Sequence, residues 1–145
     1  MARLRPGTRV WAEGPYGSLT AHRRTSGRAL LIAGGVGVTP IRALFETLPG
    51  QVTLLYRARS AEDLALGAEL ESIARGRGAR VLYALNGADG SRPRLTPQGL
   101  HSAVPGLSDH DVYLCGPPGF THEMYEALRG AGVPDRRIHH ESFYL

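Results

Sequence analysis

Short apolar runs recur along the chain from residue 29 onward, separated by polar and glycine-containing segments. Four of them cover residues 29–33, 52–56, 80–85 and 111–115, and a more polar fifth segment covers residues 137–143. Continuous apolar runs of this length are typical of strands that are buried on both faces of a parallel sheet. We therefore predict a strand at each of these segments.

Helical patterns occupy the stretches between the predicted strands. Thr39 suits an N-cap and Pro40 suits the first helical position, so a first helix is predicted through residues 41–48. A short third helix is predicted to begin near Thr96 and Pro97. Apolar stripes with helical spacing indicate the second and fourth helices, at Leu66, Leu70 and Ile73 and at Phe120, Met124, Ala127 and Leu128.

This alternation of strands and helices predicts an α/β fold with an open five-stranded parallel sheet. Right-handed crossovers put helices on both faces and favour the strand order 3-2-1-4-5. The first and fourth strands are then neighbours at the switch point, where ligands of such sheets bind. In our interpretation residues 28–145 form this domain, and residues 1–27 are a strand, a turn and a linker that precede it.

The composition excludes several kinds of site. The chain has a net charge of +4 and contains no lysine, which makes a lysine-dependent phosphate loop or Schiff base impossible. Cys115 is the single cysteine, and no cysteine or histidine cluster has the spacing of a structural metal site. The scattered arginines form no aromatic-flanked stripe for nucleic acid, and no apolar run reaches the roughly 18 residues of a membrane span.

Two glycine-proline loops follow the first and fourth predicted strands, at residues 34–40 and 115–120. Gly34, Gly35 and Gly37 allow backbone amides to approach a ligand, and the following helix N-terminus favours an anion such as a pyrophosphate. Such glycines also occur in tight strand-to-helix turns that bind nothing. Because a second glycine loop follows the neighbouring strand, we favour a nucleotide site.

The residues after the second strand bear on the choice of nucleotide. Dinucleotide-binding folds often have an acidic residue there, which binds the ribose 2′-hydroxyl. This chain instead has Arg57 and Arg59, followed by Ser60. Guanidinium groups and a hydroxyl suit a 2′-phosphate, so NADPH is favoured over NADH, with simple surface solvation as the alternative.

Three motifs together resemble the pyridine-nucleotide domain of ferredoxin-NADP reductase-like flavoproteins, in the ferric-reductase-like and oxygenase-reductase branch. They are the loops 34–40 and 115–120 and the terminal segment 141–143, and the resemblance extends over about residues 28–145. Residues 14–17 are similar to the last turn of that family's flavin-binding barrel, so residues 1–27 are interpreted as its remnant and linker. The barrel's other motifs are missing from this sequence.

The resemblance implies roles for particular residues. It assigns the pyrophosphate and ribose to Gly35, Gly37, Val38, Thr39 and Pro40, and the nicotinamide ring to Cys115, Gly116 and Pro117. It places Glu141 and Phe143 near the flavin and the hydride-transfer centre. It assigns the adenosine end to Arg57 and Ser60.

The expected function is therefore the NAD(P)H-binding domain of a flavin-dependent electron-transfer oxidoreductase. NADP or NAD is the expected cofactor of this chain, and FAD is expected in the complete enzyme. The implied partners are a flavin-binding domain or subunit and a downstream electron acceptor. We expect a cytoplasmic protein, or the cytoplasmic-facing domain of a membrane reductase.

Other functions stay open at this stage. A nucleotide-sensing module without enzymatic activity could use the same cleft, and a flavodoxin-like scaffold would bind no dinucleotide. His139 and His140 invite a metal or acid-base role, but adjacent residues of a strand face opposite sides of a sheet. Cys115 could be a nucleophile or simply a small buried apolar residue.

Overall fold

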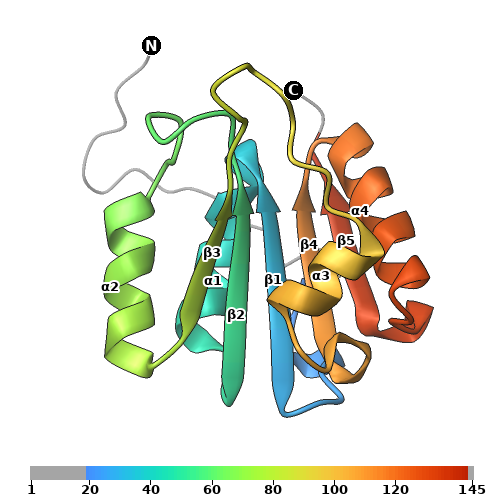
Figure 1. Ribbon diagram of the computed structural model, residues 1–145. Coiled ribbons are helices and arrows are strands. Elements are labelled where there is room, and N and C mark those ends of the chain that lie inside the picture. Colours follow the sequence, from blue (N-terminus) through green and yellow to red (C-terminus); the bar gives the residue numbers. More distant parts are fainter. Residues whose placement is uncertain (1–18, 144–145) are drawn as a thin grey trace, which may run out of the picture.

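The computed structural model describes residues 19–143, which form a five-stranded parallel sheet in the order β3-β2-β1-β4-β5 (Figure 1). The strands are β1 (Arg28–Gly34), β2 (Gln51–Arg57), β3 (Arg80–Ala84), β4 (Asp111–Gly116) and β5 (Ile138–Ser142). The helices are α1 (Val38–Thr47), α2 (Gly67–Arg77), α3 (Pro97–Ala103) and α4 (Pro118–Gly130). Short 3₁₀ turns are η1 (Ala21–Arg23), η2 (Gly35–Gly37), η3 (Leu107–Asp109) and η4 (Asp135–Arg137). The predicted fold class and strand order are confirmed.

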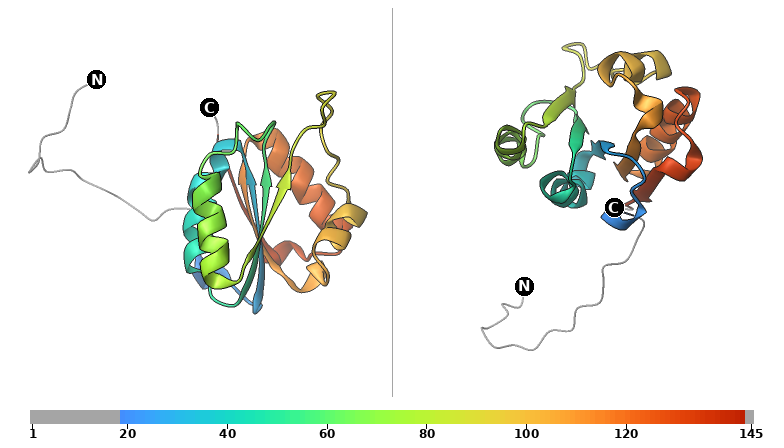
Figure 2. Two further views of the ribbon diagram at one scale, coloured as in Figure 1. Left: turned by 60° about the vertical axis from the view of Figure 1, so that its left-hand side comes forward. Right: turned by 90° about the horizontal axis from the view of Figure 1, so that it is seen from below.

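The helices form one layer on each face of the sheet (Figure 2). Leu31 and Leu54 point to the face covered by α1 and α2, whereas Leu30 and Leu55 belong to the cluster with α3 and α4. All residues of β4, and all of β1 after Arg28, are buried, as expected for central parallel strands. Two hydrophobic clusters, one per face, thus fix the sheet between its helices.

Strand register brings the carboxyl ends of four strands to one edge of the sheet. Ala33 of β1 pairs with Cys115 of β4, and Cys115 pairs in turn with Glu141 of β5. Tyr56 of β2 pairs with Ala33 on the other side. The segments that follow β1, β2, β4 and β5 therefore leave the sheet at a common edge.

The helix starts differ from the sequence prediction at two places. Thr39 is not an N-cap and Pro40 is the third helical residue, not the first, because α1 begins at Val38 directly after the turn Gly35–Gly37 and its N-cap is Gly37. Leu66 is not part of the buried stripe of α2, since it precedes the helix with a φ of 61° and is 39% exposed.

The other helix signals are confirmed. Thr96 caps α3 by accepting a hydrogen bond from the Gly99 amide at 3.1 Å, with Pro97 at the first helical position. Gly78 ends α2 with a φ of 65°, a left-handed conformation that suits glycine. Met124 and Leu128 of α4 are fully buried.

Residues 19–27 lie outside the sheet and are hydrogen-bonded to the first residue of β4. The Asp111 carboxylate accepts hydrogen bonds from the backbone amides of Thr25 (2.8 Å) and Ser26 (2.5 Å) and from the Thr25 hydroxyl (3.0 Å). The predicted barrel turn at residues 14–17 lies outside the described residues, and the domain division at residue 27 stays a prediction. Among residues 19–143 no helix is long and apolar enough to cross a membrane.

Candidate functional site

The two glycine loops lie against each other at the carboxyl edge of the sheet. A Cβ atom on Gly37 would collide with the backbone carbonyl of Cys115. A Cβ atom on Gly34 would lie 2.5 Å from the Phe120 ring, and one on Gly116 would lie 2.7 Å from it. Glycine is therefore required at these positions for the close approach of the two loops, which the sequence predicted to be neighbours.

A cleft of about 640 Å³ opens beside these loops, and we refer to it as the nucleotide cleft. Its walls come from the turn after β1, the end of β2, the loop between β3 and α3, and the start of α4. The lining residues are Gly34, Gly35, Val36, Tyr56, Arg57, Ala58, Arg59, Asp63, Ala65, Arg92, Pro93, Leu95, Pro117, Gly119, Phe120 and Glu123. Apolar walls with a few converging charged groups are typical of small-molecule sites.

Arg57 is the most constrained charged group of the nucleotide cleft. Its Nη1 donates to the carbonyls of Ala58 (2.7 Å) and Ala84 (3.2 Å), and its Nη2 donates to Asn86 Oδ1 (2.9 Å). Burial, with a smaller contribution from Arg92, lowers the pKa of Arg57. The three acceptors fix the guanidinium and leave about two of its five N–H groups for a ligand.

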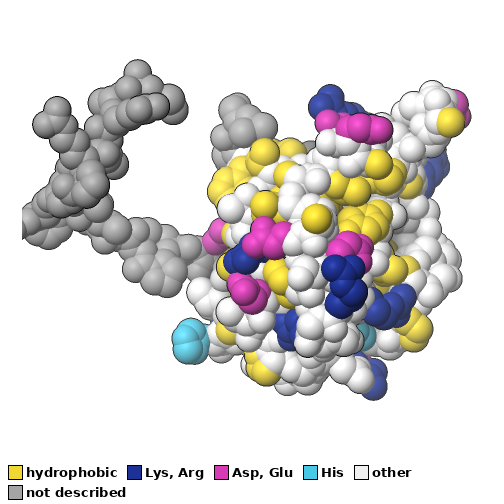
Figure 3. All heavy atoms as spheres, turned by 90° about the vertical axis from the view of Figure 1, so that its left-hand side faces the viewer, with side chains coloured by type: hydrophobic (Ala, Val, Ile, Leu, Met, Phe, Trp, Pro, Cys, Tyr) yellow, Lys and Arg dark blue, Asp and Glu magenta, His cyan; other side chains and the backbone are white. Residues whose placement is uncertain are grey.

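Ser60 and Arg59 are already engaged with an acidic residue. The Ser60 hydroxyl donates to Asp63 Oδ2 at 3.2 Å, and Arg59 Nε lies 3.4 Å from the same oxygen. Arg59 and Asp63 line the nucleotide cleft, whereas Ser60 lies beside it. On the face that carries α2, acidic and basic side chains are interspersed, as Figure 3 shows.

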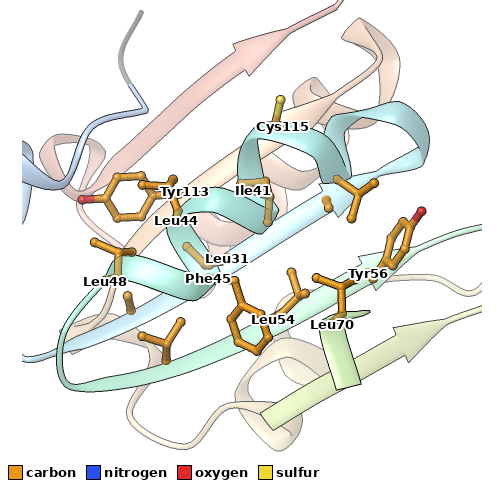
Figure 4. Close-up of a cluster of buried hydrophobic side chains, with 14 of the residues drawn as sticks. Leu31, Ile41, Leu44, Phe45, Leu48, Leu54, Tyr56, Leu70, Tyr113 and Cys115 are labelled. Carbon is orange, nitrogen blue, oxygen red and sulfur yellow. The ribbon is translucent and has the colours of Figure 1, made fainter. Parts of the chain in front are cut away.

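Cys115 and Glu141 form a second part of the site, which we call the strand-end pair. Cys115 is fully buried on the α1 face, in the cluster that includes Ile41 and Tyr113 (Figure 4). Burial first, and then the negative charge of Glu141, raise the pKa of Cys115 to about 12. The thiol is therefore protonated at neutral pH and is not an activated nucleophile.

Glu141 carries a buried oxygen without a partner. Its Oε1 has no hydrogen bond to any residue that the structure describes. A buried polar atom without a hydrogen bond lowers the stability of the folded state by about 1–3 kcal/mol, and by more if the group is charged. A donor supplied by a ligand or another domain would remove this cost.

The last described residues are fastened to the second loop. The Phe143 amide donates to the Gly116 carbonyl at 3.1 Å, and the hydroxyls of Ser142 and Thr121 lie 2.7 Å apart. Phe143 is 39% exposed. An aromatic side chain is thus available at the surface next to the strand-end pair.

The predicted site residues fall into two groups. Gly34, Gly35, Arg57 and Pro117 line the nucleotide cleft. The remaining ones lie along the same edge but outside its lining, namely Gly37, Val38, Thr39, Pro40, Ser60, Cys115, Gly116, Glu141 and Phe143. Sequence reasoning missed Asp63, Arg92 and Glu123 as lining residues, because they lie in loops or on a helix surface without a motif.

The two adjacent histidines have separate environments. His139 is buried against the Tyr113 ring, with the ring centroids 5.0 Å apart. His140 lies on the other side of β5, with its centroid 5.3 Å from that of Tyr125. Within residues 19–143 no group of three or more histidine, cysteine or acidic side chains could hold a metal ion.

Comparison with known proteins agrees with this geometry. The family model of the oxidoreductase NAD-binding domain matches residues 31–126. A flavohemoprotein of Chromobacterium violaceum is 33% identical over 89% of this chain and 35% of its own length. Ferredoxin--NADP reductase B of Sorangium cellulosum is 30% identical over 97% of this chain and 64% of its own length.

A solved structure of a flavin-containing protein has a similar fold. Flavohemoglobin from Malassezia yamatoensis, with bound FAD and heme, superposes with a TM-score of 0.74 at 28% identity. The match covers 99% of this chain and 43% of that protein, so the chain spans less than half of it. The matched segment 31–126 contains both glycine loops and most of the nucleotide cleft. The chain belongs to the oxidoreductase NAD-binding domain family of ferredoxin-NADP reductase-like, flavin-dependent oxidoreductases.

Proposed function

We propose that this chain binds NAD(P)H along the carboxyl edge of its sheet and presents the nicotinamide to a flavin held by another domain or subunit. The observation that carries the proposal is the direct contact of the two glycine loops, Gly37 against the Cys115 carbonyl, between the nucleotide cleft and the strand-end pair. In this proposal one continuous edge holds both the adenosine end and the nicotinamide end of the nucleotide.

The adenosine end fits the nucleotide cleft. Pro93, Leu95 and Phe120 supply apolar surface for an adenine ring, and Arg57 supplies free N–H groups for a phosphate. The glycine turn before α1 supplies backbone amides and a helix N-terminus for the pyrophosphate, with Val38, Thr39 and Pro40 in the first turn. A 2′-phosphate on the ribose would be bound by Arg57, with Ser60 next to it, which favours NADPH.

The nicotinamide end fits the strand-end pair. The Cys115 thiol is small, neutral and fully buried, and Glu141 Oε1, which has no hydrogen-bond partner among residues 19–143, can accept a hydrogen bond. Gly116 and Pro117 follow Cys115 at the same edge, and the exposed Phe143 is hydrogen-bonded to Gly116, so these residues would border the ring. Flavin, when bound on the partner domain, accepts the hydride.

The downstream electron acceptor belongs to the same proposal. Flavohemoprotein, ferredoxin--NADP reductase and cytochrome b5 reductase are among the relatives, and each name indicates a different acceptor. We propose that this chain supplies the nucleotide half that such reductases share. A cytoplasmic location, or the cytoplasmic face of a membrane reductase, would give it access to NADPH.

Isothermal titration of the purified chain with NADP⁺ and NAD⁺ tests the proposal. We expect one nucleotide bound per chain, tighter binding of NADP⁺, and no flavin retained during purification. Gly76→Ala is a matched control, because its Cβ meets no neighbour and lies outside the nucleotide cleft. If neither nucleotide binds, the proposal is overturned and a scaffold that binds no dinucleotide is favoured.

A further inference from the structure

A second cavity, of about 420 Å³, lies at the amino-terminal edge of the sheet, opposite to the glycine loops. Arg28, Gln51, Thr53 and Arg80 line it from the first residues of β1, β2 and β3. Register pairs Arg28 with Gln51 and Thr53 with Arg80, so these side chains are neighbours on one face. Figure 1 shows that α3 lies in front of β1 and β4 and leaves the lower part of β2 uncovered.

Two guanidinium groups converge on this cavity. Arg80 Nη2 donates to the Ala103 carbonyl at 3.4 Å, and Arg28 Nη1 lies 3.2 Å from the position of a Cβ on Gly106. Both arginines therefore reach the turn 103–106, although their strands are separated by β2. Neither forms an ion pair with another residue of the described chain.

His110 is the third basic side chain that lines this cavity. Only 6% of the residue is exposed, and it lines the cavity. Its Nδ1 lies 2.9 Å from the Gly106 carbonyl, which makes Nδ1 the protonated nitrogen of the neutral ring. In this tautomer Nε2 carries a lone pair and no proton, so the hydrogen-bond donors of the cavity are its other polar side chains.

Among the described residues 19–143, no acidic side chain lines this cavity. The acidic neighbours of His110 are Asp109, which is exposed, and Asp111. Asp111 points to the opposite face of the sheet, where Thr25 and Ser26 donate to its carboxylate. The positive charge of the two arginines is therefore not neutralised inside the cavity.

We propose that this cavity binds a phosphate group, as inorganic phosphate or as part of a small phosphomonoester. Arginine forks bind phosphate oxygens in a bidentate manner, and the Gln51 amide and the Thr53 hydroxyl supply further donors. The volume of 420 Å³ leaves room for more than a phosphate ion. The strand β1 separates the cavity from the glycine loops by about 20 Å, so this ligand is not the hydride-carrying nucleotide.

Titration of the ¹⁵N-labelled chain with inorganic phosphate and with glycerol phosphate, at constant ionic strength, tests the proposal. We expect amide shifts at Thr53, Arg80 and His110, and affinity at least ten-fold weaker in the double variant Arg28→Ala, Arg80→Ala. Arg75→Ala is the matched control, because Arg75 is exposed on α2 and lines neither cavity. If glycerol phosphate binds more tightly than inorganic phosphate, the ligand is a phosphomonoester. If the two bind equally, the ligand is free phosphate.

The single variant Arg80→Gln covers the case in which the double variant does not fold, because Arg80 is exposed on an edge strand. It should weaken phosphate binding at least three-fold with an otherwise unchanged spectrum. Shifts confined to residues 34–38, or the same loss of affinity in Arg75→Ala, would overturn the proposal. Neither result would affect nucleotide binding at the other edge, so the two proposals fail separately.

Discussion

The nucleotide cleft and the strand-end pair share one edge of the sheet but differ in how they are built. The nucleotide cleft is open, and charged groups such as Arg57, Asp63 and Glu123 stand in its walls. The strand-end pair is closed by α1 and offers a protonated thiol and one carboxyl oxygen that has no hydrogen-bond partner among residues 19–143. We infer that the first region supplies affinity and nucleotide preference, whereas the second positions the reacting ring.

The largest expected effect comes from the contact between the two loops. Gly37→Val should reduce nucleotide affinity at least a hundred-fold. The new side chain would collide with the Cys115 carbonyl and push the two glycine loops apart. Titration calorimetry and thermal unfolding measure the effect. The control Gly76→Ala should bind the nucleotide normally. It should unfold at the same or a higher temperature, because alanine has a higher helix propensity than glycine. Normal binding by Gly37→Val would show that the close approach is not needed.

The nucleotide cleft can be tested alone through Arg57. Arg57→Ala should weaken NADPH binding about ten- to a hundred-fold and NADH binding less than three-fold, because hydrogen bonds to a charged group contribute about 1.5–3 kcal/mol. Arg75→Ala should change neither affinity. Equal losses for both nucleotides would mean that Arg57 only holds Ala84 and Asn86 in place.

Substitutions in the strand-end pair should change the rate of flavin reduction rather than the affinity for the nucleotide. With a flavin domain supplied by fusion, Cys115→Ala and Glu141→Gln should each slow flavin reduction about ten-fold, a barrier change near 1.4 kcal/mol, with little change in affinity. Stopped-flow absorbance at saturating NADPH measures the rate. Ser142→Ala is a neighbouring control that should keep the rate. Unchanged rates in both variants would reduce the pair to a packing role.

The smallest expected effect concerns stability and lies outside both regions. Burial lowers the pKa of His139 and of His110 below the ordinary value of 6.5. The unfolded chain therefore binds more protons, and stability should fall as the pH decreases below about 6.5. Melting temperatures between pH 7.5 and pH 5.5 measure this effect, which His139→Leu should reduce. A melting temperature that rises toward pH 5.5 would contradict it.

The sequence predicted the regular elements better than the walls of the site. The order of the strands followed from general rules for parallel sheets, and these rules also placed the loop 34–40 beside the loop 115–120. Asp63 and Arg92 escaped prediction because their loops have no periodicity, and the shape of those loops depends on hydrogen bonds such as that from Ser60 to Asp63. Thr39 was predicted as an N-cap from its residue type, but the helix starts earlier, after the 3₁₀ turn.

The most direct test of the central claim is a titration of the ¹⁵N-labelled chain with NADP⁺. We expect amide shifts along the whole carboxyl edge, in residues 34–38, 57–60 and 115–120 and at Glu141. Glycerol phosphate should not reproduce these shifts, because it lacks the adenine and nicotinamide rings. Absence of shifts at residues 34–38 and 115–120 at millimolar NADP⁺ would contradict the claim that the two glycine loops form one nucleotide site.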